Sequence, residues 1–230
     1  MSRAADIAAG LERTHKRVAE ACAAAGRDRS ELTIIVVTKT YPATDVAILS
    51  DLGVRDIGEN RDQEAAAKAA ECAGLPVRWH FVGQLQTNKA NSVARYASVV
   101  HSVDRPRLVR ALDRAAGNEG RRLDCLVQVS LDGAPGRGGV MADGVSEIAG
   151  MIADAASLRL AGVMAVAPLE AEPGPAFAEL ARISGWLRKE HPEATWISAG
   201  MSADMEAAIA HGATHLRVGS AILGKRPYPG

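Results

Sequence analysis

Short apolar runs alternate with longer amphipathic segments along this chain, a pattern typical of strands that are each followed by a helix. The run Leu32-Thr-Ile-Ile-Val-Val-Thr-Lys39 is apolar on both side-chain parities, which indicates a strand buried on both faces in a parallel sheet. Residues 3–25 carry their apolar side chains on one helical face and are followed by Gly26, a typical stop. The chain therefore begins with a helix that precedes the first strand.

The same pattern predicts eight strands, at residues 32–39, 54–58, 78–83, 97–103, 124–130, 158–166, 195–198 and 214–218. Helices are predicted at 3–25, 42–52, from 59–60 to about 72, from 84–89 onwards, and at 105–117, 143–155, 173–191, 202–211 and 221–224. Eight strand–helix units are typical of an α/β protein with a (β/α)8 TIM barrel, here with an extra N-terminal helix. An open doubly wound sheet is the alternative. No linker divides the chain, so we expect one domain over residues 1–230.

Composition and charge narrow the function. Lys and Arg together number 27, as do Asp and Glu, so a formal net charge of zero gives no support to a nucleic-acid or membrane partner. The three cysteines are scattered and the six histidines show no convincing metal-ligand spacing, so we expect no disulfide framework and no metal site. The N-terminus does not resemble a secretory signal, and no apolar run reaches membrane length. These features favour a cytoplasmic protein.

Lys39 is the first candidate for chemistry. It is placed at the carboxyl end of a buried strand, the end at which TIM barrels carry their active groups. Partial burial lowers the pKa of a lysine and supplies the neutral amine that forms Schiff bases. A lysine that extends its ammonium group into the loop is the structural alternative.

A phosphate site is predicted at the loops that follow strands seven and eight. Arg217-Val-Gly219-Ser220 closes the last strand and opens a short helix, which is where barrels often bind phosphate. Ser202 lies in the neighbouring loop, although a helix N-cap would also explain it. The glycine-rich loop 133–139 does not match a dinucleotide motif, because Met141 occupies the position of the third glycine. We interpret it as a mobile lid or a turn.

A Schiff-base lysine and a phosphate site in one barrel suggest two ligand classes, a phosphosugar or pyridoxal 5'-phosphate (PLP). Other polar groups at predicted strand ends are His80, His101, Glu59-Asn60 and Ser102–Asp104. The two histidines are either acid–base groups or structural residues.

Motifs through most of the chain decide between these ligands. They are Val36-Val-Thr-Lys-Thr40, Gly58-Glu-Asn60, Trp79-His-Phe-Val-Gly83, Leu85-Gln-Thr-Asn-Lys89, His101-Ser-Val-Asp104, Gly162-Val-Met-Ala165, residues 200–209 and residues 217–224. In this order they resemble the pyridoxal phosphate homeostasis family, also called YggS-like or proline synthase co-transcribed proteins. More distantly, the chain is similar to the N-terminal barrel of alanine racemase.

The resemblance implies a role for each matching residue. Lys39 would hold PLP as a Schiff base, and Arg217 would face the pyridine nitrogen. The phosphate would be held by Met201, Ser202, Gly219 and Ser220, while the ring pocket would be lined by Asn60 and His80. Family members often differ at the positions of Arg61-Asp62, Arg137–Gly139 and Ser220, which concern mainly the rim of the site.

The resemblance also bears on catalysis. An arginine opposite the ring nitrogen does not readily give up a proton, which weakens the cofactor as an electron sink. Alanine racemases take one base from a second domain, and we expect none here, because the chain ends at Gly230 soon after the last predicted strand. The sequence therefore favours a monomeric PLP carrier or reservoir with little or no turnover that supplies PLP-dependent apo-enzymes. An amino-acid racemase and a Schiff-base aldolase are the alternatives.

Overall fold

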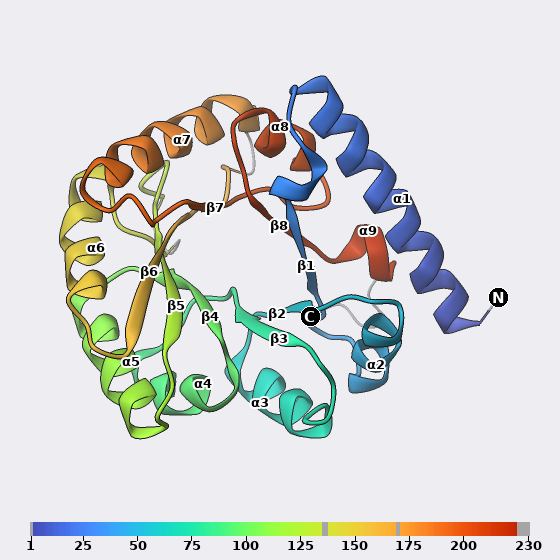
Figure 1. Cartoon of the computed structure of the whole chain (residues 1–230), viewed down its shortest axis with the longest axis horizontal. Coiled ribbons are helices and arrows are strands. Elements are labelled where there is room, and N and C mark those ends of the chain that lie inside the picture. Colours follow the sequence, from blue (N-terminus) through green and yellow to red (C-terminus); the bar gives the residue numbers. More distant parts are fainter. Residues whose placement is uncertain (1, 135–137, 169–170, 225–230) are drawn as a thin grey trace.

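Eight parallel strands form a closed barrel in the order in which they occur along the chain (Figure 1). This computed structural model describes residues 2–134, 138–168 and 171–224. The strands are β1 (Thr33–Val37), β2 (Asp56–Glu59), β3 (Arg78–Phe81), β4 (Val99–Val103), β5 (Leu123–Gln128), β6 (Leu158–Met164), β7 (Trp196–Ser198) and β8 (His215–Val218). Four residues of β1 are in register with β8, from Thr33 opposite His215 to Val36 opposite Val218. This pairing closes the barrel, so the (β/α)8 prediction is confirmed and the open sheet is excluded.

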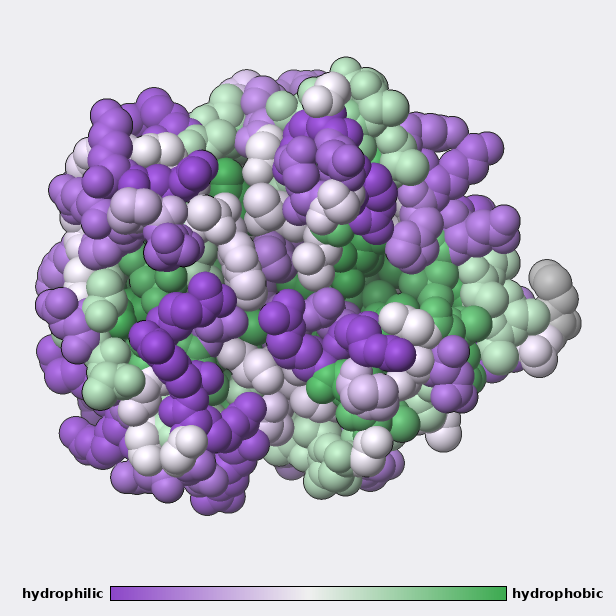
Figure 2. Space-filling model, viewed as in Figure 1, coloured by the Kyte–Doolittle hydropathy of each residue, from purple (hydrophilic) through white to green (hydrophobic). Residues whose placement is uncertain are grey.

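Helices surround the barrel as an outer ring (Figure 1). They are α2 (Ala43–Asp51), α3 (Asp62–Glu71), α4 (Ala90–Tyr96), α5 (Pro106–Asn118), α6 (Val145–Ala153), α7 (Pro173–Glu190), α8 (Met205–Ala210) and α9 (Ser220–Leu223), with short 3-10 turns η1 (Arg29–Glu31), η2 (Thr87–Lys89) and η3 (Ala142–Gly144). Their apolar faces pack on the outside of the strands, and the face drawn in Figure 2 is mostly hydrophilic, with hydrophobic residues showing in its depressions. None of the described helices is long and apolar enough to cross a membrane.

The predicted N-terminal helix is present as α1 (Arg3–Ala24), which packs across α8, α9 and α2 (Figure 1). Gly10 makes the close approach to α9 possible. A Cβ atom built at this residue would lie 2.1 Å from the carbonyl oxygen of Ile222. Two arginines extend the contact, because Arg3 donates to the carbonyl of Leu223 and Arg17 donates to the carbonyl of Ser202. Helix α1 thus supports the loops at which the phosphate site is predicted.

Several predicted boundaries are wrong by two or three residues. Strand β1 ends at Val37, so Lys39 lies two residues beyond it, and β3 ends at Phe81 instead of residue 83. The helix predicted from residue 84 begins with the turn at Thr87 and continues as α4, and the helix predicted from residue 202 begins at Met205. These errors share a cause, because the hydrophobic pattern continues into the loops, whereas the backbone hydrogen bonds that define strands and helices cover fewer residues.

The barrel interior is partly apolar and partly polar. A small cluster of Val99, Leu126, Ala161 and Met164 fills one part of it. Polar side chains from five strands, among them His80, His101 and Arg217, fill much of the rest.

Candidate functional site

A cavity of about 410 Å³ opens where the carboxyl ends of the strands meet their loops. Among the predicted residues, Lys39, Asn60, Met201, Ser202, Arg217, Gly219 and Ser220 line it. The lining is completed by Val37, Tyr41, Val82, Val166 and Ala203. The structure therefore brings together residues from six strand–loop junctions, and among the predicted cofactor residues only His80 is not part of this lining.

Lys39 projects from a backbone segment that the side chains of Glu64 and Lys68 hold in place. The amide of Thr40 donates to a carboxylate oxygen of Glu64, and the carbonyl of Thr38 accepts from Nζ of Lys68 at 2.8 Å. Thr40 has a φ of 71°, a left-handed conformation that is rare for a β-branched residue. Such strain persists only where neighbouring contacts determine the backbone, and it gathers at functional sites. The residue after Lys39 is in this conformation.

A buried charge cluster lies behind this segment. The ammonium group of Lys68 lies 2.6 Å from Glu59 and 3.1 Å from Glu64. Glu59 also accepts a hydrogen bond from the hydroxyl of Thr38. Burial raises the pKa of Glu59, and the charge and hydrogen bond of Lys68 act against that rise. The other oxygen of Glu59, Oε2, is buried without a hydrogen-bond partner among the described residues. Breaking this cluster would leave a charge unpaired beside Lys39.

The loops after β7 and β8 meet at Ser202, Gly219 and Ser220, which we call the hydroxyl corner. The hydroxyl of Ser202 accepts from the amide of Ala221 at 3.3 Å and lies 3.3 Å from the hydroxyl of Ser220. Ser202 does not cap a helix, because α8 begins at Met205 and its N-cap residue is Asp204. The capping alternative is therefore wrong, and the Ser202 hydroxyl is directed to the other loop.

Gly219 lets the backbone at the hydroxyl corner lie close to β1. A Cβ atom at this position would be 3.1 Å from the carbonyl oxygen of Val37, which is tight for a real side chain. The carboxylate of Asp204 meanwhile accepts from the amide of Met201 at 2.6 Å and fixes the preceding turn. Hydroxyl groups and backbone N–H groups at the start of a helical turn provide donors suited to an anion.

Arg217 forms the floor of the cavity. Its guanidinium group is buried and donates to Ser198 Oγ at 2.6 Å and to the carbonyl of Ala165 at 2.8 Å. Burial lowers its pKa to about 10, and the charge of Asp204 acts in the opposite direction. The group therefore remains cationic at neutral pH.

The structure does not place His80 at the cavity. Side chains two residues apart on a strand lie on the same face, so His80 and Val82 both point into the barrel. Of the two, Val82 is nearer the carboxyl end of the strand and lines the cavity. His80 lies one layer deeper, where its ring nitrogens contact Asp56 and His101, each at 2.9 Å. The resemblance implied that His80 lines the ring pocket, but the cavity lining contains Val82 of the same strand face instead.

The remaining strand-end candidates lie away from the cavity. Ser102 is a buried residue of β4, and Asp104 accepts from the Gly139 amide at 3.2 Å and pairs with Arg105. Arg137 lies outside the described residues. The described residues hold no cluster of three or more histidines, cysteines or carboxylates that could bind a metal ion.

Sequence reasoning missed the apolar lining of the cavity. Val37 and Val82 could have been found from the alternation of side chains along a strand. Val37 lies two residues before Lys39, and Val82 lies two residues after His80. Val166 ends the predicted strand 158–166 and Ala203 directly follows Ser202, so the rule that strand ends carry the site also points to these two residues. A shallower groove of about 510 Å³ between η3 and α7 contains none of the predicted residues.

Comparison with known proteins gives consistent matches. The family model described as alanine racemase, N-terminal domain, matches residues 11–227. A pyridoxal phosphate homeostasis protein of Mycobacterium tuberculosis is 44% identical over 97% of this chain and 94% of that protein. The protein of the same name from Escherichia coli K12 is 35% identical over 97% of this chain and 98% of that protein. The structure of PipY from Synechococcus elongatus with PLP bound is 34% identical, with a TM-score of 0.80 over 90% of this chain and all of that one.

Proposed function

The chain belongs to the alanine racemase N-terminal domain family, and we propose that it is a pyridoxal phosphate homeostasis protein that binds PLP and stores or delivers it with little or no turnover. The observation that carries this proposal is the cavity in which Lys39, Arg217 and the hydroxyl corner converge. Relatives that bear this name are 35% to 44% identical over nearly the whole chain.

The residues present fit this cofactor. The cavity volume of about 410 Å³ is in the range typical of small-molecule sites. PLP has an aldehyde, a pyridine nitrogen and a phosphate, which call for an amine, a ring-nitrogen partner and an anion site. Lys39 supplies the amine, Arg217 supplies a cationic donor, and Ser202 and Ser220 supply hydroxyl groups around the Gly219 backbone. When bound, PLP provides an aldehyde that condenses with an amine and a ring that can accept electrons.

The same residues favour binding over catalysis. An arginine donates hydrogen bonds and does not readily release its proton, so Arg217 would leave a facing ring nitrogen unprotonated and a poor electron sink. Racemisation also needs a base on each face of the substrate. The hydroxyl of Tyr41, which lines the cavity, donates to the carbonyl of Gly224 at 2.7 Å. Tyr96 contacts Asp62 instead of the cavity. We therefore assign Lys39 the role of an anchor for the cofactor.

Absorption spectroscopy tests the binding. The protein purified with PLP should be yellow, and borohydride reduction should fix the cofactor to the peptide that contains Lys39. Lys39→Ala should lose the visible band of the bound cofactor, whereas Lys16→Ala, which changes an exposed lysine of α1, should keep it. A colourless wild-type protein in the presence of PLP would overturn the proposal.

Optical rotation separates a carrier from a racemase. The protein loaded with PLP is incubated with L-alanine and, in parallel, with D-alanine. A carrier should leave the rotation of both solutions nearly constant over hours, and rapid loss of rotation would identify a racemase.

Three finer statements belong to the same proposal. We expect a monomer, which light scattering coupled to gel filtration would measure. We expect the protein in the cytoplasm, to be checked by fractionation of cells. We also expect transfer of PLP to apo-enzymes, to be followed as recovery of an apo-enzyme's activity when the loaded protein is added in place of free PLP.

A further inference from the structure

A continuous chain of polar side chains crosses the barrel interior from the cavity towards the amino ends of the strands. Arg217 donates to Ser198 Oγ at 2.6 Å, and Ser198 Oγ lies 2.9 Å from His101 Nδ1. The other nitrogen of His101 lies 2.9 Å from His80 Nδ1, and His80 Nε2 lies 2.9 Å from the carboxylate of Asp56. These residues come from β8, β7, β4, β3 and β2, and we call them the barrel relay.

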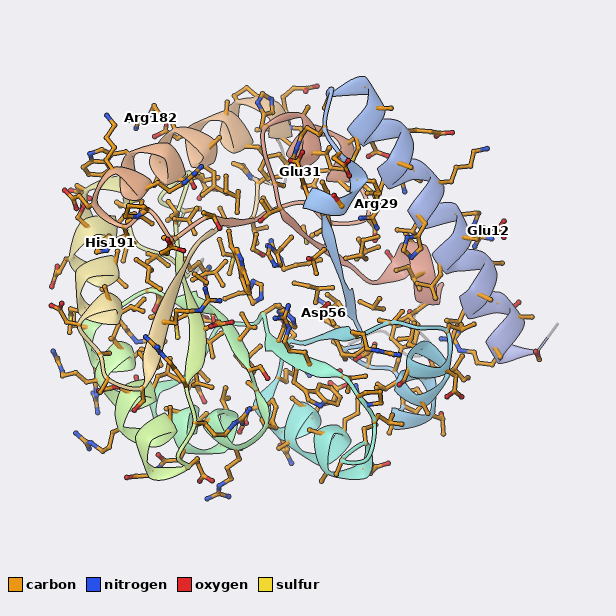
Figure 3. All side chains as sticks on the ribbon, viewed as in Figure 1. Glu12, Arg29, Glu31, Asp56, Arg182 and His191 are labelled. Carbon is orange, nitrogen blue, oxygen red and sulfur yellow. The ribbon has the colours of Figure 1, made fainter. Side chains whose placement is uncertain are left out.

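The residues of the barrel relay are buried except at its Asp56 end. Ser198 and His101 are fully buried, and His80 and Arg217 are 1% and 6% exposed. The path reaches solvent at Asp56, whose side chain is 19% exposed and pairs with the half-exposed Arg78. Figure 3 labels Asp56 close to the centre of the ring of strands. A charged carboxylate at one end of the barrel is thus joined by hydrogen bonds to a charged guanidinium group that lines the cavity.

The hydrogen bonds of the barrel relay run in one direction. A guanidinium group only donates and an ionised carboxylate only accepts, so Ser198 accepts from Arg217 and Asp56 accepts from His80. The Ser198 hydroxyl then donates to His101 Nδ1, His101 Nε2–H donates to His80 Nδ1, and His80 Nε2–H donates to Asp56. Every group is satisfied and both imidazole rings are neutral. The opposite direction with neutral rings would place an unprotonated His80 nitrogen against the carboxylate.

Electrostatics supports this arrangement. Burial lowers the pKa of His80 and lowers the pKa of His101 further, so both rings stay neutral at pH 7. Burial would raise the pKa of Asp56, but its hydrogen bond with His80 and the hydrogen bond and charge of Arg78 lower it overall. Among the described residues, no carboxylate forms an ion pair with Arg217. The carboxylate that is joined to the positive charge of Arg217 by hydrogen bonds is therefore that of Asp56, at the far end of the relay.

We propose that Asp56, His80, His101 and Ser198 are positioning residues that aim the Arg217 guanidinium group at the cavity and tune its strength as a donor to the cofactor's ring nitrogen. This inference rests on the proposed function, because it takes PLP as the group that Arg217 faces. It assigns a role to His80 different from the ring-pocket role expected from the sequence. The relay makes the bound cofactor sensitive to a charge at the opposite end of the barrel.

The chain offers a matched pair of variants. Asp56 accepts from Arg78 at 2.8 Å and Asp124 accepts from Arg159 at 2.6 Å, and both carboxylates lie near the amino ends of their strands with 19% and 22% exposure. Both arginines also lie over the ring of Trp196. Asp56→Asn removes the charge at the end of the relay, and Asp124→Asn removes an equivalent charge outside it.

The main readout is the ¹⁵N resonance of the pyridine nitrogen in PLP labelled at that atom and bound to each variant. Asp56→Asn should shift this resonance and raise the Kd for PLP by about tenfold, the effect of losing roughly one charge-assisted hydrogen bond. Asp124→Asn should leave both values close to those of the wild type. Equal shifts in the two variants, or none in a folded Asp56→Asn protein, would refute the relay. Ser198→Ala, which breaks an inner link, should give the Asp56→Asn result even if the latter folds poorly.

A second readout does not depend on the cofactor. Imidazole ¹⁵N shifts of His80 and His101 in the PLP-free wild type should show both rings protonated at Nε2 and unprotonated at Nδ1. Any other tautomer would overturn the direction of the relay. If the tautomers are as expected but PLP does not bind, the proposed function fails while the hydrogen-bond path stands, so the two failures are distinguishable.

Discussion

Lowering the pH should destabilise the folded protein well before its carboxylates titrate, because three histidines are buried as neutral rings. Burial lowers the pKa of His215 to about 3 and lowers the pKa of His101 well below its ordinary value. Burial also lowers the pKa of His80. In the unfolded chain these rings have a pKa of about 6.5 and take up protons below that pH. Between the two pKa values the unfolded state binds more protons, so stability falls as the pH falls.

The magnitude follows from this difference. For one histidine with a pKa of about 6.5 when unfolded and about 3 when folded, the free energy of unfolding drops by about 2 kcal/mol between pH 7.5 and pH 5. His215 alone should therefore cost about 2 kcal/mol, and His101 and His80 add to this loss in the same direction. Glu59 acts against this loss, because its raised pKa lets the folded state take up a proton. A loss of this size is large against a typical total stability of about 5–15 kcal/mol.

Urea unfolding followed by circular dichroism at pH 7.5 and pH 5, at constant ionic strength, measures this loss. His215→Asn removes one of the three rings, which stacks on Trp196 with 4.2 Å between ring centroids. The variant should be less stable than the wild type at pH 7.5 but should lose about 2 kcal/mol less on acidification. If the wild type is equally stable at both pH values, or if His215→Asn keeps the full pH dependence, the histidines are not buried as neutral groups.

Two further predictions concern the supports of the cavity. Lys68→Met should lower the free energy of unfolding, measured with urea, by about 3–5 kcal/mol, because it leaves the buried Glu59 carboxylate without its cationic partner. The double variant Lys68→Met/Glu59→Gln should lose less stability, because it removes the buried charge as well. Gly10→Ala should force α1 away from the carbonyl of Ile222, cost about 2 kcal/mol and weaken PLP binding measured by fluorescence. Gly150→Ala in α6, where a Cβ atom would meet nothing within 4 Å, should be neutral or stabilising; a similar loss in both glycine variants would contradict the close-packing argument.

The order of strands and helices, and most residues of the cavity, could be predicted from the amino-acid sequence. Period-2 and period-3.6 patterns depend on local side-chain direction, so they identify strands and helices without knowledge of the fold. Once eight strand–helix units were recognised, the barrel rule placed Lys39, Ser202, Gly219 and Ser220 at one end. Closed pairing of β1 with β8 then confirmed the fold class.

The contacts inside the barrel could be found only from the packed fold. Asp56, His80 and His101 come from the consecutive strands β2, β3 and β4, Ser198 comes from β7, and each looks like an isolated polar residue in the sequence. Their contact depends on how far each strand is displaced along the barrel, and a shift of two residues moves a side chain from the cavity into the layer beneath it. Local patterns carry no information about that displacement. The resemblance implied a place for His80 at the cavity, whereas the packed barrel places it in the path that leads to Arg217.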